Sequence, residues 1–186
     1  MTVQVSKRFF TVEEYHRMGE VGILGEDDRV ELIEGEIVQM SPIGSRHAAC
    51  VDRLLQNLMD KVKGRAIVRV QSPIRLGDRS EPQPDLVLLR PREDFYASGH
   101  PGPGDVLLVI EVAESSAEYD REVKVPLYAR YGIVEVWLVD LERNRVEVYR
   151  EPKEGRYWEV REVLREEEVK LKLLPEVSLG VGQILV

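Results

Sequence analysis

The sequence predicts a mixed α/β domain, in which one central mixed sheet is flanked by helices. Helix-like and strand-like segments alternate along the chain, and the run DVLLVIEV at 105–112 is almost wholly apolar, as in a central strand covered on both faces. Residues 45–63 have the i, i+3, i+4 apolar spacing of a helix that buries one side. A chain of 186 residues can bury one core and is short for two, so we expect a single domain over 1–186.

The N-terminal elements have clear local signals. Thr11 and Glu14 have capping-box spacing, which predicts a short helix from Thr11. Residues 29–40 alternate apolar and charged side chains around Glu34-Gly35, which predicts a β-hairpin.

A long helix is expected to open at Ser45 and to end near Gly64. His47 lies in its first turn, on the face predicted to point toward the sheet. The apolar stripe on that face is Val51, Leu54, Leu55, Leu58, Met59 and Val62.

Three strand-like runs follow the long helix, at 66–70, 73–76 and 85–89, and the first two are close enough in sequence to pair as neighbours. Residues 90–104 are rich in proline and glycine and form a loop. Its length is unusual for a compact domain, so it is a candidate functional or mobile segment.

The last third begins with a helix and continues with strands. Ser115 and Glu118 again have capping-box spacing, and the helix should run to about Tyr131 with a kink or a late start at Pro126. A buried strand at 133–139, a turn at Asn144 and a partner strand at 145–149 come next. A turn at 151–155, a polar strand at 156–164 and one or two C-terminal strands complete the expected order.

Composition narrows the class of protein. The apolar fraction of 43% suits a globular domain, no run is long enough to span a bilayer, and the N-terminus lacks the apolar core of a signal peptide, so the default expectation is a cytoplasmic protein without a membrane partner. The one cysteine, Cys50, excludes an internal disulfide and a cysteine-type zinc site, and is expected to be a buried structural thiol. The net charge of −8 argues against a protein that simply coats nucleic acid, although an acidic metal site would itself add negative charge.

Two carboxylates occupy unusual places on predicted strands. Asp85 follows Pro84 at the start of a buried strand, where it could simply cap the strand, and Glu111 lies near the end of the apolar run, where it could pair with a buried Arg or Lys. If the two strands are neighbours, the carboxylates could instead share a hard cation such as Mg²⁺, with the backbone carbonyl of Val112 as a third ligand.

The basic and imidazole candidates are each open to an ordinary explanation. Lys124 follows Asp120 at i, i+4 spacing, so a surface salt bridge explains both. His47 could be a hydrogen-bonded core residue. His16 and His100 lie in unrelated sequence contexts, so no zinc site is expected. Of the hairpin acids Glu31, Glu34 and Glu36, most should be solvated, and one could face the carboxylate site.

Taken together, these segments resemble the Uma-type restriction endonucleases, a branch of the PD-(D/E)XK nuclease superfamily. Each motif is weak alone, but their joint occurrence in this order is specific, and they cover most of residues 11–150. The matching stretches are VELIEGEIVQMSP, with His47 shortly after it, QPDLVLL at 83–89, LLVIEVAESS at 107–116 and DREVKVPLYARYGIVEVWLVD at 120–140.

The resemblance assigns roles residue by residue. The superfamily pattern has an Asp on one core strand, which Asp85 matches, and then a Glu and a Lys two residues apart on the next strand. Glu111 matches the acidic residue, but Ala113 occupies the lysine position, and the resemblance moves the lysine role to Lys124 on the following helix. Glu31 then matches the acidic residue of the family's first hairpin, and His47 its helix-opening histidine.

The resemblance also implies a restriction-endonuclease-like fold, Mg²⁺ or Mn²⁺ as cofactor, cleavage of phosphodiester bonds with DNA as substrate, and a homodimer. Two other functions stay open. The broken lysine motif and the negative net charge favour a nuclease-fold protein that has lost turnover and serves in nucleic-acid binding or as a structural module. A metal-dependent hydrolase of small phosphoesters is the other.

Overall fold

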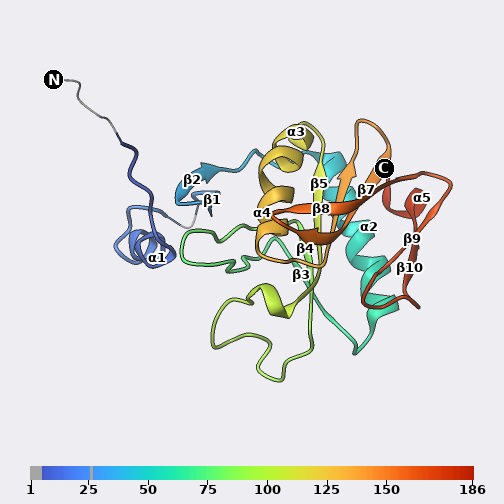
Figure 1. Ribbon diagram of the computed structural model, residues 1–186, viewed down its shortest axis with the longest axis horizontal. Coiled ribbons are helices and arrows are strands. Elements are labelled where there is room, and N and C mark those ends of the chain that lie inside the picture. Colours follow the sequence, from blue (N-terminus) through green and yellow to red (C-terminus); the bar gives the residue numbers. More distant parts are fainter. Residues whose placement is uncertain (1–5, 26) are drawn as a thin grey trace.

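The computed structural model describes residues 6–25 and 27–186, and at its centre lies a six-stranded mixed sheet (Figure 1). The strands lie in the order β3-β4-β5-β6-β7-β8; β5 and β6 are parallel, and every other neighbouring pair is antiparallel. Their bounds are β3 (Ile67–Val70), β4 (Leu86–Leu89), β5 (Val106–Ala113), β6 (Glu135–Asp140), β7 (Arg145–Lys153) and β8 (Arg156–Leu164).

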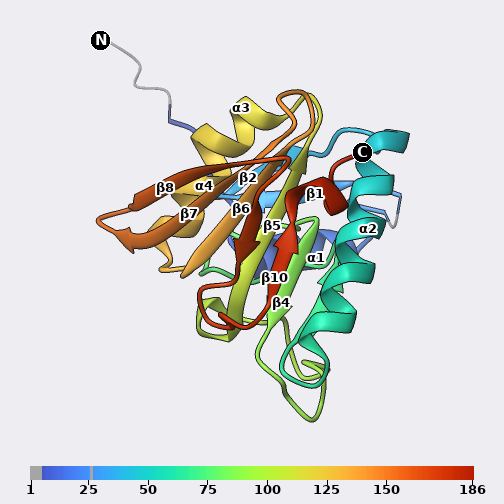
Figure 2. The ribbon, with the colours of Figure 1, turned by 90° about the vertical axis from the view of Figure 1, so that its right-hand side faces the viewer.

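The first face of the sheet is covered by the long helix α2 (Ser45–Val62) and by the C-terminal segment (Figure 2). Leu54 and Leu58 of α2 are fully buried in the same core cluster as Leu108 and Ile110 of β5. The C-terminal segment adds a two-stranded sheet of β9 (Glu168–Lys170) and β10 (Ser178–Gly180), and then the short helix α5 (Val181–Ile184).

The opposite face is covered by a helical segment that follows β5. It consists of α3 (Ala117–Tyr119), a π-helical turn η2 (Asp120–Lys124) and α4 (Val125–Arg130). Val109 and Ala113 of β5 pack into the core cluster beneath it. Because side chains alternate between the faces of a strand, Glu111 points to this same face, toward η2 and α4.

The N-terminal segment lies beside this sheet (Figure 1). It contains α1 (Val12–Glu20) and a separate hairpin of β1 (Val30–Ile33) and β2 (Glu36–Gln39). An isolated antiparallel bridge between Leu32 and Glu81 joins the hairpin to the chain segment that leads into β4. The 90–104 loop ends in a short 3-10 helix, η1 (Pro103–Asp105), directly before β5.

Several local predictions are confirmed. Thr11 and Glu14 form both hydrogen bonds of a capping box. The hairpin turns at Glu34 and Gly35, which have φ of 50° and 84°, and Asn144 turns between β6 and β7 with φ of 52°. The positive φ values of Glu34 and Gly35 match the left-handed conformations that a tight two-residue hairpin turn requires.

Other expectations were wrong. Residues 73–76 form no strand, and β3 pairs with β4 instead. Ile74 and Leu76 are nevertheless buried, because their amides bond to Pro82 and Ser80 across a turn and their side chains enter the core. Met59 is 57% exposed and lies outside the buried stripe of α2.

The helical segment after β5 ends at Arg130, next to Tyr131 as predicted, but differs from its prediction at the N-terminus. Its N-cap is Ser116, with no side-chain cap hydrogen bond, so Ser115 and Glu118 form no capping box. A π-helical turn precedes α4, which begins at Val125 with Pro126 in its first turn, so the late helix start expected at this proline is confirmed. The C-terminal helix α5 was not expected. No helix of the described ranges is long and apolar enough to cross a membrane.

Candidate active site

The five side chains singled out in the sequence line one cavity of about 370 Å³. They come from distant parts of the chain: from β1, α2, the residue before β4, β5 and η2. The cavity opens where β4 begins and β5 ends, which is one end of an antiparallel pair. The five are Glu31, His47, Asp85, Glu111 and Lys124.

Asp85 is held by its neighbours on β5 and α2. Its Oδ2 atom accepts a hydrogen bond from the Val112 amide at 2.9 Å and lies 3.0 Å from His47 Nε2. The amide and carbonyl of one residue in a strand point to the same side, so the Val112 carbonyl also faces the Asp85 side of β5. Val112 lines the cavity as well.

Lys124 does not form the surface salt bridge with Asp120 that its spacing allowed. Its side chain is buried, and Nζ lies 3.1 Å from Glu111 Oε1 and 3.2 Å from Glu31 Oε2. The backbone of η2 explains the difference, since the Val125 amide bonds to the Asp120 carbonyl five residues back and widens the turn. Asp120 instead accepts a hydrogen bond from the Ser116 hydroxyl.

Glu31 is the hairpin acid that faces the site. It is only 3% exposed, whereas Glu34 and Glu36 are exposed. Besides contacting Lys124, Glu31 accepts a hydrogen bond from the Gln83 amide at 3.0 Å. The segment before β4 therefore fixes Glu31 and Asp85 together.

Two further residues of the site were missed in the sequence. The Tyr128 hydroxyl donates to Glu111 Oε1 at 2.5 Å, deep in the protein. Asp120 is buried and lines the cavity. Asp120, Lys124 and Tyr128 recur every fourth residue, which is the one sequence signal that could have placed all three on a single inward helix face.

Burial and charge act against each other on the buried groups of the site. Burial raises the pKa of Glu111 above its ordinary value, although Lys124 opposes this by its positive charge. Burial would lower the pKa of Lys124, but the carboxylates of Glu111, Glu31 and Asp120 outweigh it and raise that pKa, so the ammonium stays charged. The hydrogen bond to Asp85 raises the pKa of His47.

The donor set of the cavity fits a hard divalent cation. Carboxylates outnumber basic side chains along its wall, and Mg²⁺ prefers oxygen ligands while it keeps several waters. Within the part of the chain that the structure describes, both hydrogen bonds to Asp85 use Oδ2, which leaves Oδ1 free to bind a cation. Among the described residues, no group of three His, Cys, Asp or Glu ligand atoms that all lie within 4.8 Å of one another includes both Asp85 and Glu111, so other oxygen donors such as water would have to complete a coordination sphere here.

Cys50 has the structural role expected of it. It is fully buried on α2, and burial raises the pKa of its thiol to about 12, so it is protonated and unreactive near neutral pH. His16 and His100, which lie in unrelated sequence contexts, meet at Glu81 in the structure, and none of the three lines the cavity.

Comparisons with known proteins agree with this architecture. The model of the Uma2 family, described as "Putative restriction endonuclease", matches residues 12–182. A crystal structure from Anabaena variabilis ATCC 29413, described as a putative nuclease belonging to DUF820, superposes with a TM-score of 0.71 and 20% sequence identity, over 94% of this chain and 97% of that chain. At that identity the likeness establishes the fold, a mixed sheet with flanking helices. No curated protein matches the chain.

Proposed function

Since the chain belongs to the Uma2 family of restriction-endonuclease-like proteins, we propose that it is a Mg²⁺- or Mn²⁺-dependent endonuclease that hydrolyses DNA phosphodiester bonds. The observation that carries the proposal is the buried Lys124, which lies against Glu111 in the wall of a cavity that Asp85 also lines. A buried ion pair is weak evidence for stability alone, so its retention at a cavity wall favours a functional role.

Asp85 and Glu111 are the proposed metal ligands, with the Val112 carbonyl as a third. The bound cation would supply a Lewis acid that polarises a phosphodiester oxygen and lowers the pKa of a bound water. His47 is a positioning residue in this scheme, because its Nε2 contacts the same Asp85 oxygen as the Val112 amide. These two contacts hold Oδ2, so Oδ1 is the Asp85 oxygen that would bind the cation.

Lys124 is proposed to orient the attacking water or to stabilise the negative charge that develops on the phosphate. An ammonium has three N–H donors, and Glu111 and Glu31 use two of them. The third remains for a water or phosphate oxygen in the cavity. Glu31 thus helps to hold Lys124 beside Glu111. The lysine position of the superfamily pattern, on β5, is occupied by Ala113.

A plasmid-nicking assay with Mg²⁺ or Mn²⁺ tests the proposal. We expect cleavage by the wild type, and loss of at least about 100-fold in rate for Asp85→Asn and for Lys124→Met, which are losses typical of removing one electrostatic contributor to the transition state. Asp60→Asn and Lys61→Met are matched controls, because both side chains are exposed on α2 and far from the cavity residues in the fold.

The metal and lysine roles are separated by Mn²⁺ binding measured alongside cleavage. Lys124→Met should keep or strengthen Mn²⁺ affinity, since a positive charge is removed beside the ligands, whereas Asp85→Asn should weaken it. Absence of cleavage by wild type with intact Mn²⁺ binding would favour the turnover-deficient nuclease fold. Faster hydrolysis of a small phosphoester than of duplex DNA would favour the small-substrate alternative.

Dimerisation is also part of the proposal. It rests on the resemblance and on β8, an edge strand of the central sheet whose outer face carries three exposed apolar side chains. Isolated apolar residues are common on monomers, but a row of them along one strand is typical of an interaction surface. The three are Trp158, Val160 and Leu164, which are 58%, 56% and 52% exposed.

A further inference from the structure

We propose that His16, Glu81 and His100 form a second metal site, specific for a borderline cation of the Zn²⁺ type and separate from the candidate active site. These three side chains are the one group of three or more His, Cys, Asp or Glu residues, within 6–25 and 27–186, whose ligand atoms all lie within 4.8 Å of one another. None of them lines the active-site cavity.

The strongest support is the state of Glu81. It is only 3% exposed, its Oε1 atom lies 2.6 Å from His16 Nε2, and its Oε2 atom is buried without any hydrogen-bond partner. A buried carboxylate oxygen with no partner is expensive, and native proteins rarely leave one unsatisfied. An ion pair with His16 accounts for one oxygen and leaves the other unexplained, whereas a bound cation accounts for both.

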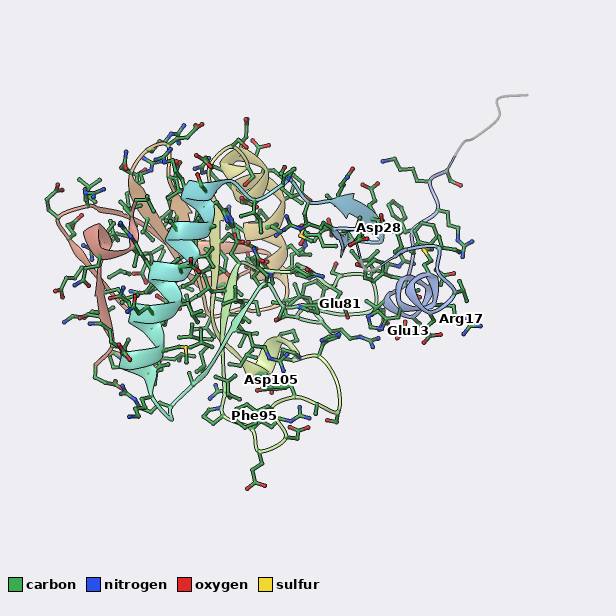
Figure 3. The ribbon with its side chains drawn as sticks, turned by 180° about the vertical axis from the view of Figure 1, so that it is seen from behind. Glu13, Arg17, Asp28, Glu81, Phe95 and Asp105 are labelled. Atoms are coloured by element: carbon green, nitrogen blue, oxygen red, sulfur yellow. The ribbon has the colours of Figure 1, made fainter. Side chains whose placement is uncertain are left out.

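The three ligands come from segments that backbone hydrogen bonds already hold together. Glu81 donates its amide to the Leu32 carbonyl, and the Val12 amide at the start of α1 bonds to Asp78. The Pro101 carbonyl, next to His100, accepts a hydrogen bond from the Arg75 amide. Figure 3 shows Glu81 on the segment between the sheet and α1.

Only side-chain motion separates this arrangement from a coordinated one. Tetrahedral zinc with bonds of about 2.0–2.1 Å places its ligand atoms about 3.3 Å apart. The His16 and His100 rings lie 6.0 Å apart between centroids, and both side chains are exposed and can rotate. Glu81 is fixed from within, so the site has one rigid buried ligand and two adjustable outer ones.

The donor set selects the metal. Two imidazoles and one carboxylate suit Zn²⁺, with water as the fourth ligand, while Mg²⁺ and Ca²⁺ prefer oxygen donors throughout. The two sites of the chain are thus chemically distinct. The bound ion would tie α1 and the 90–104 loop to the segment at Glu81, two residues before Gln83, whose amide holds Glu31.

The test is titration of metal-free, untagged protein with ZnCl₂ in the presence of millimolar Mg²⁺, which occupies the oxygen-rich site. We expect one Zn²⁺ to bind per chain. His16→Gln and His100→Gln should each weaken binding by about 10- to 100-fold or more, because the loss of an outer-shell partner alone has an effect of that size. His47→Gln is the matched control and should bind Zn²⁺ as the wild type does. Folding of each variant is checked by circular dichroism, and exposure of both target histidines makes misfolding unexpected.

Thermal unfolding supplies a second readout. Zn²⁺ at about 100 times its Kd should raise the Tm of the wild type by about 5–10 °C and leave the Tm of Glu81→Gln unchanged. Without metal, Glu81→Gln should unfold no lower than the wild type, because the substitution removes a buried charge. The proposal is overturned if Zn²⁺ does not bind under Mg²⁺, or if Zn²⁺ binding is unchanged by the His16 and His100 substitutions.

Discussion

At the scale of single residues, the candidate active site depends on how Glu111 is held. Glu111 lies on the buried strand β5, and the Lys124 ammonium and the Tyr128 hydroxyl both contact its Oε1 atom. Lys124 supplies charge, and Tyr128 supplies direction, because a phenol donates along one axis only. Tyr128 is therefore a positioning residue for the proposed metal ligand.

Tyr128→Phe should separate these contributions. The change removes only a hydroxyl that donates to a carboxylate, so we expect a loss of about 1.5–3 kcal/mol in stability and weaker Mn²⁺ binding. The control is Tyr157→Phe, whose buried hydroxyl donates to the Ile133 carbonyl away from the cavity and should affect stability alone. Urea unfolding and Mn²⁺ titration measure the two effects, and equal Mn²⁺ affinity in both variants would contradict a positioning role.

At the scale of elements, the β1–β2 hairpin shows how a turn can hold a site residue in place. Gly35 has φ of 84°, and a Cβ added there would lie 2.6 Å from the Phe9 Cβ and 3.0 Å from the Phe10 carbonyl oxygen. The chain before α1 therefore packs directly against the turn of the hairpin that carries Glu31.

Gly35→Ala should destabilise the protein more than Gly64→Ala does. Both glycines have positive φ, so each substitution should cost about 1 kcal/mol in backbone strain, but a Cβ at Gly64 meets nothing within 4 Å. Overpacking at Gly35 should add about 1–3 kcal/mol. Chemical denaturation of the two variants gives the comparison, and equal losses would mean that the contact with Phe9 relaxes freely.

Elements with local signals were predictable from the sequence, and elements defined by distant contacts were not. The capping box at Thr11 and the turn at Glu34-Gly35 depend on neighbours within a few residues. Residues 73–76 have strand-like composition but bond across a turn to 80–82, and the helical segment that carries Lys124 contains a π-helical turn. The apolar periodicity of an α-helix, 3.6 residues per turn, does not predict where a π-helical turn will form.

The candidate site follows the same division. The sequence alone singled out Asp85 and Glu111, because a carboxylate next to or within an apolar strand is rare. That β4 and β5 are direct neighbours, and that Glu31 and Lys124 meet, depends on strand order and on a hairpin that belongs to a different sheet. Similarly, the meeting of His16 and His100 at Glu81 joins three segments that no local pattern connects.

At the scale of the whole molecule, acid stability should depend on Glu147 of β7. This buried carboxylate contacts Arg121 of η2 at 2.8 Å and Arg145 at 2.7 Å, and so fastens the helical segment that carries Lys124 to the sheet. Burial opposes its ionisation, but hydrogen bonds from Arg121, Tyr149 and Arg145 lower the pKa of Glu147 to about 2.

A pKa lowered by folding stabilises the protein above the unfolded pKa and ceases to do so as the pH falls through the folded pKa. Ionised Glu147 should therefore contribute about 3 kcal/mol at neutral pH, lost between about pH 5 and pH 2. Urea unfolding across that range should show a flatter profile for Glu147→Gln. Glu162→Gln is the control, since Glu162 pairs with the same Arg145 but is 54% exposed, and should change little.

Assembly is the last whole-molecule property, and the outer face of β8 is where we expect it. Tyr157 and Val163 point inward, and the alternate side chains Trp158 and Val160 point to solvent. Val160→Glu should weaken a contact made by this face, because a charge would have to be buried at the centre of an apolar patch. Val21→Glu, at a similarly exposed valine after α1, is the matched control.

Light scattering coupled to size exclusion at micromolar concentration provides the measurement. We expect the wild type and Val21→Glu to have twice the chain mass of 21.3 kDa, and Val160→Glu to shift toward the monomer. Because neighbouring β8 positions alternate with charged side chains, we expect the contact to form through the face of the strand and not by adding a strand at the sheet edge. A wild type that stays monomeric across the concentration range would rule out the dimer, and equal dissociation by both valine substitutions would place the interface elsewhere.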